Sequence, residues 1–535
     1  MNITATIVFV AIFILVTVLG FLASRWKRAD LNSLHEWGLA GRRFGTLLTW
    51  FLLGGDLYTA YTFIAVPALV FGAGAYGFFG VPYTILVYPF AFVVFGRLWA
   101  VAHKHGFITP ADFIRARYGS RWLALAIAAT GIIATMPYIA LQLVGIEVVI
   151  GALGFSTEGL IGELPLIVAF AILAAYTYAS GLRAPAMIAV VKDILIYVTI
   201  IAAIIVIPAQ LGGYGKIFSA IPPEKLLLKA PGANSLGQDF GQYSTYLTTA
   251  FGSAMALFLY PHAMTAIFSA SGPGTLRRNM ALLPAYSLVL GIIALLGFMA
   301  LAAGVKELPE YAEQFKQFGP NFAVPALFLH SFPDWFVGIA FAAIGIGALV
   351  PAAIMSIAAA NLYTRNVHRE FINANVSPKQ ETDLAKIVSL VVKFGALAFI
   401  LFLPLQYAIQ LQLLGGVWMI QTFPAIIIGL YTRWFDHRGL LLGWLTGIVS
   451  GTWMAATLGF KSSAYPLEIF GYTITGYAAF YALILNFAVA IVVTLIARAL
   501  KLPTSHDATT ESDYDDGDEI DSSMTPDLKA VPAVD

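Results

Sequence analysis

The chain has 535 residues, 59% of them hydrophobic and only 11% charged, and its formal net charge is +1. Soluble globular proteins carry about 25% charged residues, so this composition excludes that class. The sequence has no cysteine, which excludes disulfides, thiolate metal sites and cysteine nucleophiles. Apolar stretches of about twenty residues recur from end to end, and each can cross a bilayer core of about 30 Å. We therefore expect an all-α integral membrane protein.

The first apolar run, residues 3–23, is followed by basic residues and preceded by none. A signal peptide has the opposite order, so this run is expected to be a retained helix. Continuing along the chain, the apolar pattern predicts about 13 transmembrane helices: 4–23, 44–70, 77–101, 121–151, 163–181, 184–208, 244–270, 281–304, 334–363, 384–403, 406–430, 438–458 and 472–498.

An odd number of crossings puts the two termini on opposite sides of the membrane, with the N-terminus expected outside and the C-terminus in the cytoplasm. The predicted inside loops are rich in Arg and Lys, as membrane insertion requires of the cytoplasmic side. The predicted outside loops hold only six basic residues: Lys216, Lys225, Lys229, Lys306, Lys316 and Lys461. The distribution of charge supports the count of crossings and predicts a multi-pass protein of the cytoplasmic (inner or plasma) membrane.

The chain divides into a polytopic transmembrane domain, residues 1–503, and a tail, residues 504–535. Two long outside segments, about 209–243 and 305–333, are expected to be loops with short surface helices. The tail holds ten acidic residues and one basic residue. Its low apolar content predicts an acidic, disordered cytoplasmic appendage. The expected surroundings are a lipid bilayer, with no nucleic-acid partner, and the expected assembly is a monomer or a weak homo-oligomer.

Two apolar segments are interrupted by small residues, at Gly54-Gly55 and at Gly252-Ser253. Paired interruptions in corresponding positions of two halves indicate a transport site near the middle of the membrane. Unwound backbone is tolerated there only where it lines a cavity enclosed by protein. The alternative is that these glycines are points of close helix packing.

Asp56 follows the first pair of glycines and is the acidic residue that most needs an explanation. An ionised carboxyl at the bilayer centre costs at least about 2.5–3.5 kcal/mol, so it needs a partner or water. Asp56 is expected to line a cation or proton path, to anchor unwound backbone by hydrogen bonds, or to face water at a helix end.

Hydroxyl and amide side chains gather around both interruptions and form the predicted wall of a cavity. They hold a substrate, or they join helices to one another by hydrogen bonds. The candidates for binding a substrate or a proton, besides Asp56, are Tyr58, Thr59, Tyr61, Thr62, Gln142, Thr248, Thr249, Ser253 and Gln421. Lys192 and Lys393 are interpreted as lying near the cytoplasmic ends of their helices.

Several stretches resemble the sodium:solute symporter family across nearly the whole chain. They include "GGDLYTAYTF" (54–63), "HKHGFITPADFIRARYGSRW" (103–122), "GLRAPAMIAVVKDILIY" (181–197) and "AAIMSIAAANLYTRNVHREF" (352–371). Within that family, "LFLYPHAMTAIFSA" (257–270) and "LQLLGGVWMIQTFPAIIIGLYTRW" (411–434) look most like the monocarboxylate permease branch. The resemblance implies a LeuT-like 5+5 inverted repeat whose first and sixth core helices are broken.

The resemblance also implies a sodium site between the first and eighth core helices. Its ligands here would be the carbonyls of Gly54, Leu57 and Ala353 and the hydroxyl of Ser356, with a contribution from Asp193. The family usually adds a second hydroxyl, where this chain has Ile357, and isoleucine has no oxygen ligand to give. The coupling ion is therefore left open between Na+ and H+, because a desolvated carboxyl can carry a proton.

The expected function is a cation-coupled symporter for a short monocarboxylate such as lactate, pyruvate or acetate. A sodium symporter for a neutral polar solute (an amino acid, a vitamin or a polyol) is the alternative. An intramembrane enzyme is not expected, because there is no cysteine and most histidines fall at or beyond helix ends. No cofactor and no metal site beyond the coupling ion are expected.

Overall fold

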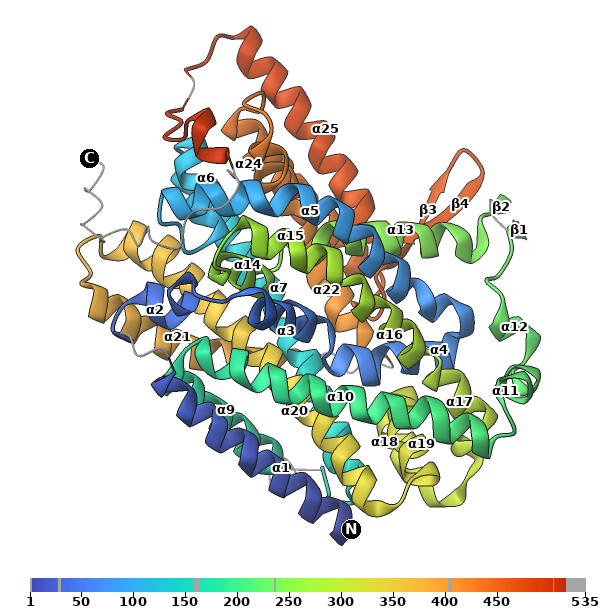
Figure 1. Ribbon diagram of the computed structural model, residues 1–535. Helices are drawn as coiled ribbons and strands as arrows, with labels where there is room; N and C mark the ends of the chain where they lie inside the picture. The colour runs from blue at the N-terminus through green and yellow to red at the C-terminus, as the bar shows by residue number, and fades with distance from the viewer. Residues whose placement is uncertain are drawn as a thin grey trace.

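The computed structural model describes residues 2–26, 30–157, 164–234, 237–402, 407–503 and 505–515, without the side chains of residues 56, 234 and 397–402. Within these ranges the chain is almost entirely helical (Figure 1). The long helices are α1 (Ile3–Leu22), α5 (Gly80–Lys104), α7 (Arg121–Ala152), α9 (Leu164–Ser180), α10 (Arg183–Gln210), α20 (Asp334–Leu362), α21 (Pro378–Phe402), α24 (His437–Thr457) and α25 (Ala478–Ala499).

Other segments are runs of shorter helices. They are α3 (Thr46–Leu57), η3 (Tyr61–Ala65) and α4 (Val66–Ala73); α13 (Gly241–Leu257) and α14 (Pro261–Ser269); α15 (Pro273–Leu282), α16 (Pro284–Ala294) and α17 (Leu296–Ala302); and α22 (Ile409–Met419), η9 (Ile420–Thr422), α23 (Phe423–Ile426) and η10 (Ile428–Leu430). Short connecting helices include α2 (Leu34–Leu39), α6 (Pro110–Tyr118), α11 (Tyr214–Ala220), α12 (Pro223–Leu226), α18 (Ala312–Phe318) and α19 (Ala323–Ser331).

Each of the thirteen predicted helical ranges coincides with one of these helices or runs of helices. By length and composition, nine helices of the described residues can cross a membrane, or ten if α13 and α14 form one span. The mostly helical membrane architecture is therefore confirmed, and the number of thirteen crossings stays a prediction. The last range was predicted to start too early, because residues 472–477 form a strand and not a helix.

Four short strands form one sheet at the edge of the helical body (Figure 1). They are β1 (Gly232–Asn234), β2 (Gly237–Asp239), β3 (Ala464–Ile469) and β4 (Tyr472–Tyr477), in the order β1-β2-β4-β3. β3 and β4 are an antiparallel hairpin, and β2 pairs with β4 in parallel. The sheet ties the long loop before α13 to the hairpin before α25, two segments that were both predicted to lie outside.

α20 is the centre of the helical body and is buried over nearly its whole length. It packs against α1, α7, α10, α14 and α21. Small residues allow this crowding: a side chain at Gly338 of α20 would meet the backbone of Ala5 in α1. α1 leaves large apolar side chains such as Ile7 and Ile14 exposed, as a helix that faces lipid must.

Loops that were predicted to share one side of the membrane contact one another. The Asn2 side chain donates to Asp334 Oδ1 at 2.7 Å, and the Asn2 amide donates to Leu153 O at 3.0 Å. On the opposite side, the Phe44 amide donates to Ser269 O at 3.2 Å. These contacts join segments that were predicted to share a side, while the orientation in the membrane stays a prediction.

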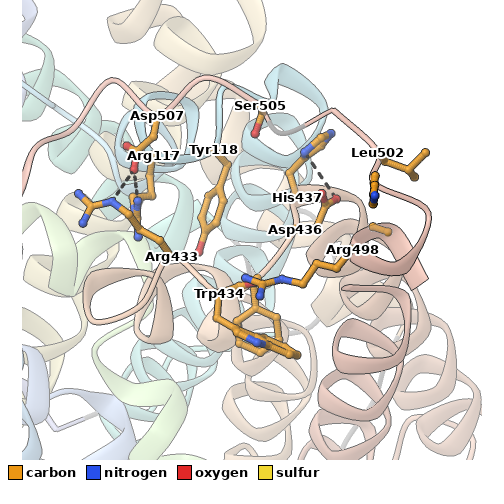
Figure 2. Close-up of a pocket in the computed structure, with 13 residues that line it drawn as sticks. Arg117, Tyr118, Arg433, Trp434, Asp436, His437, Arg498, Leu502, Ser505 and Asp507 are labelled. Atoms are coloured by element: carbon orange, nitrogen blue, oxygen red, sulfur yellow. Dashed lines mark hydrogen bonds and ion pairs between the residues drawn. The ribbon is translucent and has the colours of Figure 1, made fainter. Parts of the chain in front are cut away.

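The first part of the acidic tail, residues 505–515, is docked on the end of the molecule that carries α6 (Figure 1). Asp507 accepts hydrogen bonds from Arg117 and Arg433, and Figure 2 shows this pair of contacts beside a cavity of about 530 Å³. Asp513 is buried and pairs with Lys104 Nζ at 2.6 Å. This order differs from the disorder predicted for the tail after Pro503, because the acids meet the basic side chains of Lys104, Arg117 and Arg433; residues 516–535 lie outside the described residues.

Replacement of Asp513 by alanine is expected to release this docked segment. Burial raises the pKa of the Asp513 carboxyl, but hydrogen bonds from Lys104, Thr510 and His105 outweigh burial and hold that pKa below its ordinary value of 3.8. The stabilisation of the docked segment by the Asp513 carboxylate is therefore complete at neutral pH, and it is lost as the pH falls below that value. A charged hydrogen bond is worth about 1.5–3 kcal/mol, so exchange of the tail amides should accelerate about tenfold or more.

Hydrogen exchange of the full-length protein in detergent at pH 7 measures this release. Asp515→Ala is the matched control, because Asp515 is exposed and no ion pair of the described residues includes it. Equal protection of residues 505–515 in wild type and Asp513→Ala would contradict the role of Asp513.

Candidate functional site

The first interrupted helix breaks later than predicted. α3 runs without interruption through Gly54 and Gly55 and ends at Leu57, and Tyr58 leaves helical geometry with φ −92° and ψ 85°. The prediction of a break at the two glycines is therefore wrong in position. A side chain at Gly54 would overlap the ring of Tyr286, so this glycine is a point of close packing, the alternative that the sequence had left open.

Side chains satisfy the backbone exposed by this break. The Ala60 amide donates to Gln142 Oε1 at 3.2 Å, the Tyr61 amide to Thr59 Oγ1 at 3.0 Å, and the Thr62 hydroxyl to the Leu57 carbonyl. All these residues are buried. Unwound backbone inside a membrane needs such partners. The structure thus brings Thr59, Thr62 and Gln142 together at the first break, and their predicted part in binding a substrate or proton stays a prediction.

The second interrupted helix also breaks beyond its predicted position. α13 continues through Gly252 and Ser253 to Leu257, and α14 begins at Pro261 after a bend of 46°. Proline has no backbone N–H and fits the first position of a helix, which explains the new start. Gly252 instead packs against the ring of Tyr477. The Ser253 hydroxyl is buried and has no hydrogen-bond partner among the described residues.

α7 connects the two breaks. Gln142 holds the first break, and Tyr138, one turn earlier, lies with its ring centre 5.3 Å from that of Tyr260 and 5.4 Å from that of His262 at the second break. His262 is buried as the second residue of α14. α14 has no side-chain cap, so an uncapped helix start and an imidazole lie beside Tyr138 of α7.

Thr248 and Thr249 lie away from the second break, on the side of the molecule that carries the sheet. Thr249 lines a cavity of about 220 Å³ together with Tyr76 and Tyr477, and its hydroxyl is 3.4 Å from Tyr76 Oη. The Thr248 hydroxyl accepts a hydrogen bond from the Tyr477 amide at 2.9 Å. Thr249 therefore belongs to this cavity, which we call the vestibule, and Thr248 holds the start of α25. Neither threonine belongs to the unwound residues of the second break.

Gln421 is not at either break. Its amide nitrogen donates to Val417 O and to Ala479 O, and its oxygen accepts from Asn486 Nδ2 at 3.1 Å. Ala479 and Asn486 belong to α25, so the described partners of this side chain join η9 to α25. The structure separates Gln421 from the predicted cavity, because its position along the helix faces α24 and α25 rather than α7.

A cluster of buried polar residues lies behind the first break. Lys192 of α10 donates from Nζ to Gly55 O at 2.6 Å and to Tyr58 O at 2.8 Å, and it pairs with Asp193 Oδ1 at 3.0 Å. The Tyr286 hydroxyl donates to Asp193 Oδ2 at 2.7 Å. The Tyr58 hydroxyl donates to Tyr286 O at 3.0 Å. This cluster fixes the end of α3 against α10 and α16.

The oxygens predicted to bind a cation all have partners within the protein. Gly54 O accepts from the Tyr58 amide at 3.1 Å, and Leu57 O accepts from Thr62. In α20 the Ser356 hydroxyl donates to Ala353 O at 2.8 Å. The backbone of Asp56 belongs to α3, but its side chain lies outside the described residues, so its three interpretations stay open.

Lys192, Tyr286 and Tyr138 were not predicted to be parts of this site. Lys192 had a usable signal, because it stands beside Asp193 inside an apolar helix, and intramembrane charges pair and mark function. Tyr286 and Tyr138 had no such signal, since tyrosines in apolar helices are common. Their roles appear only when α16 and α7 are placed against the breaks.

Known proteins resemble this chain over most of its length. The model of the sodium:solute symporter family matches residues 37–447. A monocarboxylate transport permease protein of Rhizobium johnstonii is 52% identical over 93% of this chain and 98% of its own. The uncharacterized symporter YodF of Bacillus subtilis is 34% identical over 84% of this chain and 87% of its own.

Among solved structures, a Na+-coupled sialic acid symporter in a substrate-bound outward-open state matches with a TM-score of 0.71. The match covers 94% of this chain and 98% of the other at 14% identity. At that identity the likeness concerns the fold, and it supports the predicted LeuT-like arrangement with two broken core helices.

Proposed function

This chain belongs to the sodium:solute symporter family, and we propose that it is the symporter of a short monocarboxylate such as lactate, pyruvate or acetate. It is a multi-pass membrane transporter and not an enzyme. The observation that carries the choice of substrate is the 52% identity, over nearly the full length of both chains, to a protein described as a monocarboxylate transport permease.

The geometry of the second break supports an anionic substrate. α14 begins at Pro261 without a side-chain cap, and the start of a helix carries a partial positive charge. His262 and Tyr138 stand beside it with ring centres 5.4 Å apart. A carboxylate placed there would accept hydrogen bonds from backbone N–H groups and side-chain donors. Ser253, with its unpartnered buried hydroxyl, offers a donor for the substrate one turn before the break.

The route to this position starts in the vestibule of about 220 Å³ lined by Tyr76, Thr249 and Tyr477. Tyr260, at the second break, donates from its hydroxyl to Gln412 O at 3.1 Å, and α22, which holds Gln412, also lines the vestibule through Leu413. We assign the vestibule to the extracellular side and the tail to the cytoplasm of a cell whose cytoplasmic membrane holds the protein. Alternating access would then move the substrate past the two breaks.

The family supports sodium as the coupling ion, while proton coupling is the alternative that Ile357 keeps open. The second candidate for the substrate is a neutral polar solute, because hydroxyls and amides at the breaks suit one equally well. Lactate and lactamide separate these substrates, since the two molecules differ at the carboxylate and otherwise share their shape.

Reconstitution into proteoliposomes tests the proposal. Radiolabelled lactate should accumulate under an inward cation gradient, and excess pyruvate or acetate should compete, whereas lactamide should not. Sodium and proton gradients are imposed in separate runs, with protein-free liposomes as the control. Absence of lactate accumulation under both gradients, or equal competition by lactamide, would refute a carboxylate-selective symporter.

A further inference from the structure

The unwound end of α3 receives a positive charge from a neighbouring helix. Lys192 of α10 and its neighbour Asp193 have no solvent-exposed surface. The described oxygens within 3.0 Å of the Lys192 ammonium include the carbonyls of Gly55 and Tyr58 and Asp193 Oδ1. The two carbonyls flank the last residues of α3, so the ammonium lies directly at the first break.

The residues at this break do not fit the sodium ion that the family resemblance implies. Each predicted ligand oxygen already has a hydrogen-bond partner, in the pairs Tyr58–Gly54, Thr62–Leu57 and Ser356–Ala353. Ile357, where a second hydroxyl is usual, is fully buried and apolar. Lys192 donates instead to the carbonyls of Gly55 and Tyr58, each one residue further along the chain than a predicted ligand.

We propose that the Lys192 ammonium occupies, in this chain, the place at the break that the resemblance assigns to sodium, and that sodium does not bind there. An ammonium is a compact charge with three N–H donors, which suits a group of oxygens. It satisfies carbonyls that the break removes from the helix and balances the charge of Asp193. A metal cation beside it would meet a like charge in surroundings of low dielectric constant.

This inference rests on the proposed function only where it bears on the coupling ion of the symporter. The experiment that tests it does not require transport. Equilibrium binding of ²²Na+ is measured on purified, detergent-solubilised full-length protein and on the variant Ser356→Ala. We expect no sodium binding to wild type, or binding that Ser356→Ala leaves unchanged because it lies elsewhere. Sodium binding to wild type that Ser356→Ala abolishes would overturn the proposal. The sodium-binding result can be interpreted even if the protein does not take up lactate, because the binding measurement does not depend on transport.

Removal of the ammonium should create a sodium site. In Lys192→Ala combined with Ile357→Ser, Asp193 loses the ammonium that pairs with its Oδ1, and a second hydroxyl is supplied. The melting temperature of this variant should be about 5 °C higher in NaCl than in KCl, as expected for a ligand well above its Kd. Equal melting temperatures in the two salts would count against Lys192 as the group that excludes sodium.

Lys393 gives the matched control, because it is a second buried lysine, in α21. Its Nζ has no hydrogen-bond partner among the described residues. Lys393→Ala should melt at the same temperature in NaCl and KCl. If the double variant does not fold, ²²Na+ binding to wild type and Ser356→Ala still decides the proposal.

Discussion

Gly54→Ala should reduce the initial rate of lactate uptake by about tenfold or more. A methyl group at this position would overlap the ring of Tyr286. Extra atoms in a well-packed core cost about 1–3 kcal/mol, which is about 5–150-fold in an equilibrium. The displaced ring would carry its hydroxyl away from Asp193, which it now meets at 2.7 Å. One methyl group would thus disturb the cluster that holds the end of α3.

The control for this substitution is Gly45→Ala, at the residue that precedes the same helix. Gly45 is the N-cap of α3, and an added side chain there would meet no atom within 4 Å. Gly45→Ala should therefore transport at nearly the wild-type rate. Uptake is normalised to the amount of reconstituted protein, and size-exclusion chromatography checks that each variant is folded. Uptake by Gly54→Ala within about twofold of wild type would refute the packing role given to Gly54.

The helices could be predicted because their signal is local. A run of about twenty apolar residues identifies a crossing wherever it occurs, and charge sets its direction. The start of α25 was missed for the same reason, since the apolar and aromatic residues of β4, "YTITGY" (472–477), continue directly into the helix. Hydropathy does not distinguish a strand that packs on the protein from the first turns of a helix.

The positions of the breaks could not be predicted, because they depend on residues distant in the sequence. A glycine pair permits either a break or close packing. Tyr286 decides the matter at Gly54, and Tyr477 does so at Gly252. At the second break the local signal was Pro261, which can begin a helix but cannot continue one. The docked tail likewise depends on Lys104, Arg117 and Arg433, which only the fold assembles.

Gln142 and Gln421 are both buried and were predicted alike, but they are expected to behave differently. Gln142 accepts the hydrogen bond of the Ala60 amide at the first break, whereas Gln421 joins η9 to α25. Gln142→Leu leaves a buried N–H without a partner, at a cost of about 1–3 kcal/mol, directly at the unwound residues. Lactate uptake should fall by about tenfold or more in a protein that still folds.

Gln421→Leu removes hydrogen bonds of similar strength, but they lie between helices and not at a break. The melting temperature of this variant should therefore fall, while its lactate uptake per folded molecule should stay near that of wild type. Initial uptake rates and thermal unfolding of both variants, measured on the same preparations, separate the two effects. Equal losses of uptake in both variants would mean that helix packing in general, and not the backbone of the first break, limits transport. A loss confined to Gln142→Leu would identify the Ala60 amide as a bond that the transport cycle needs.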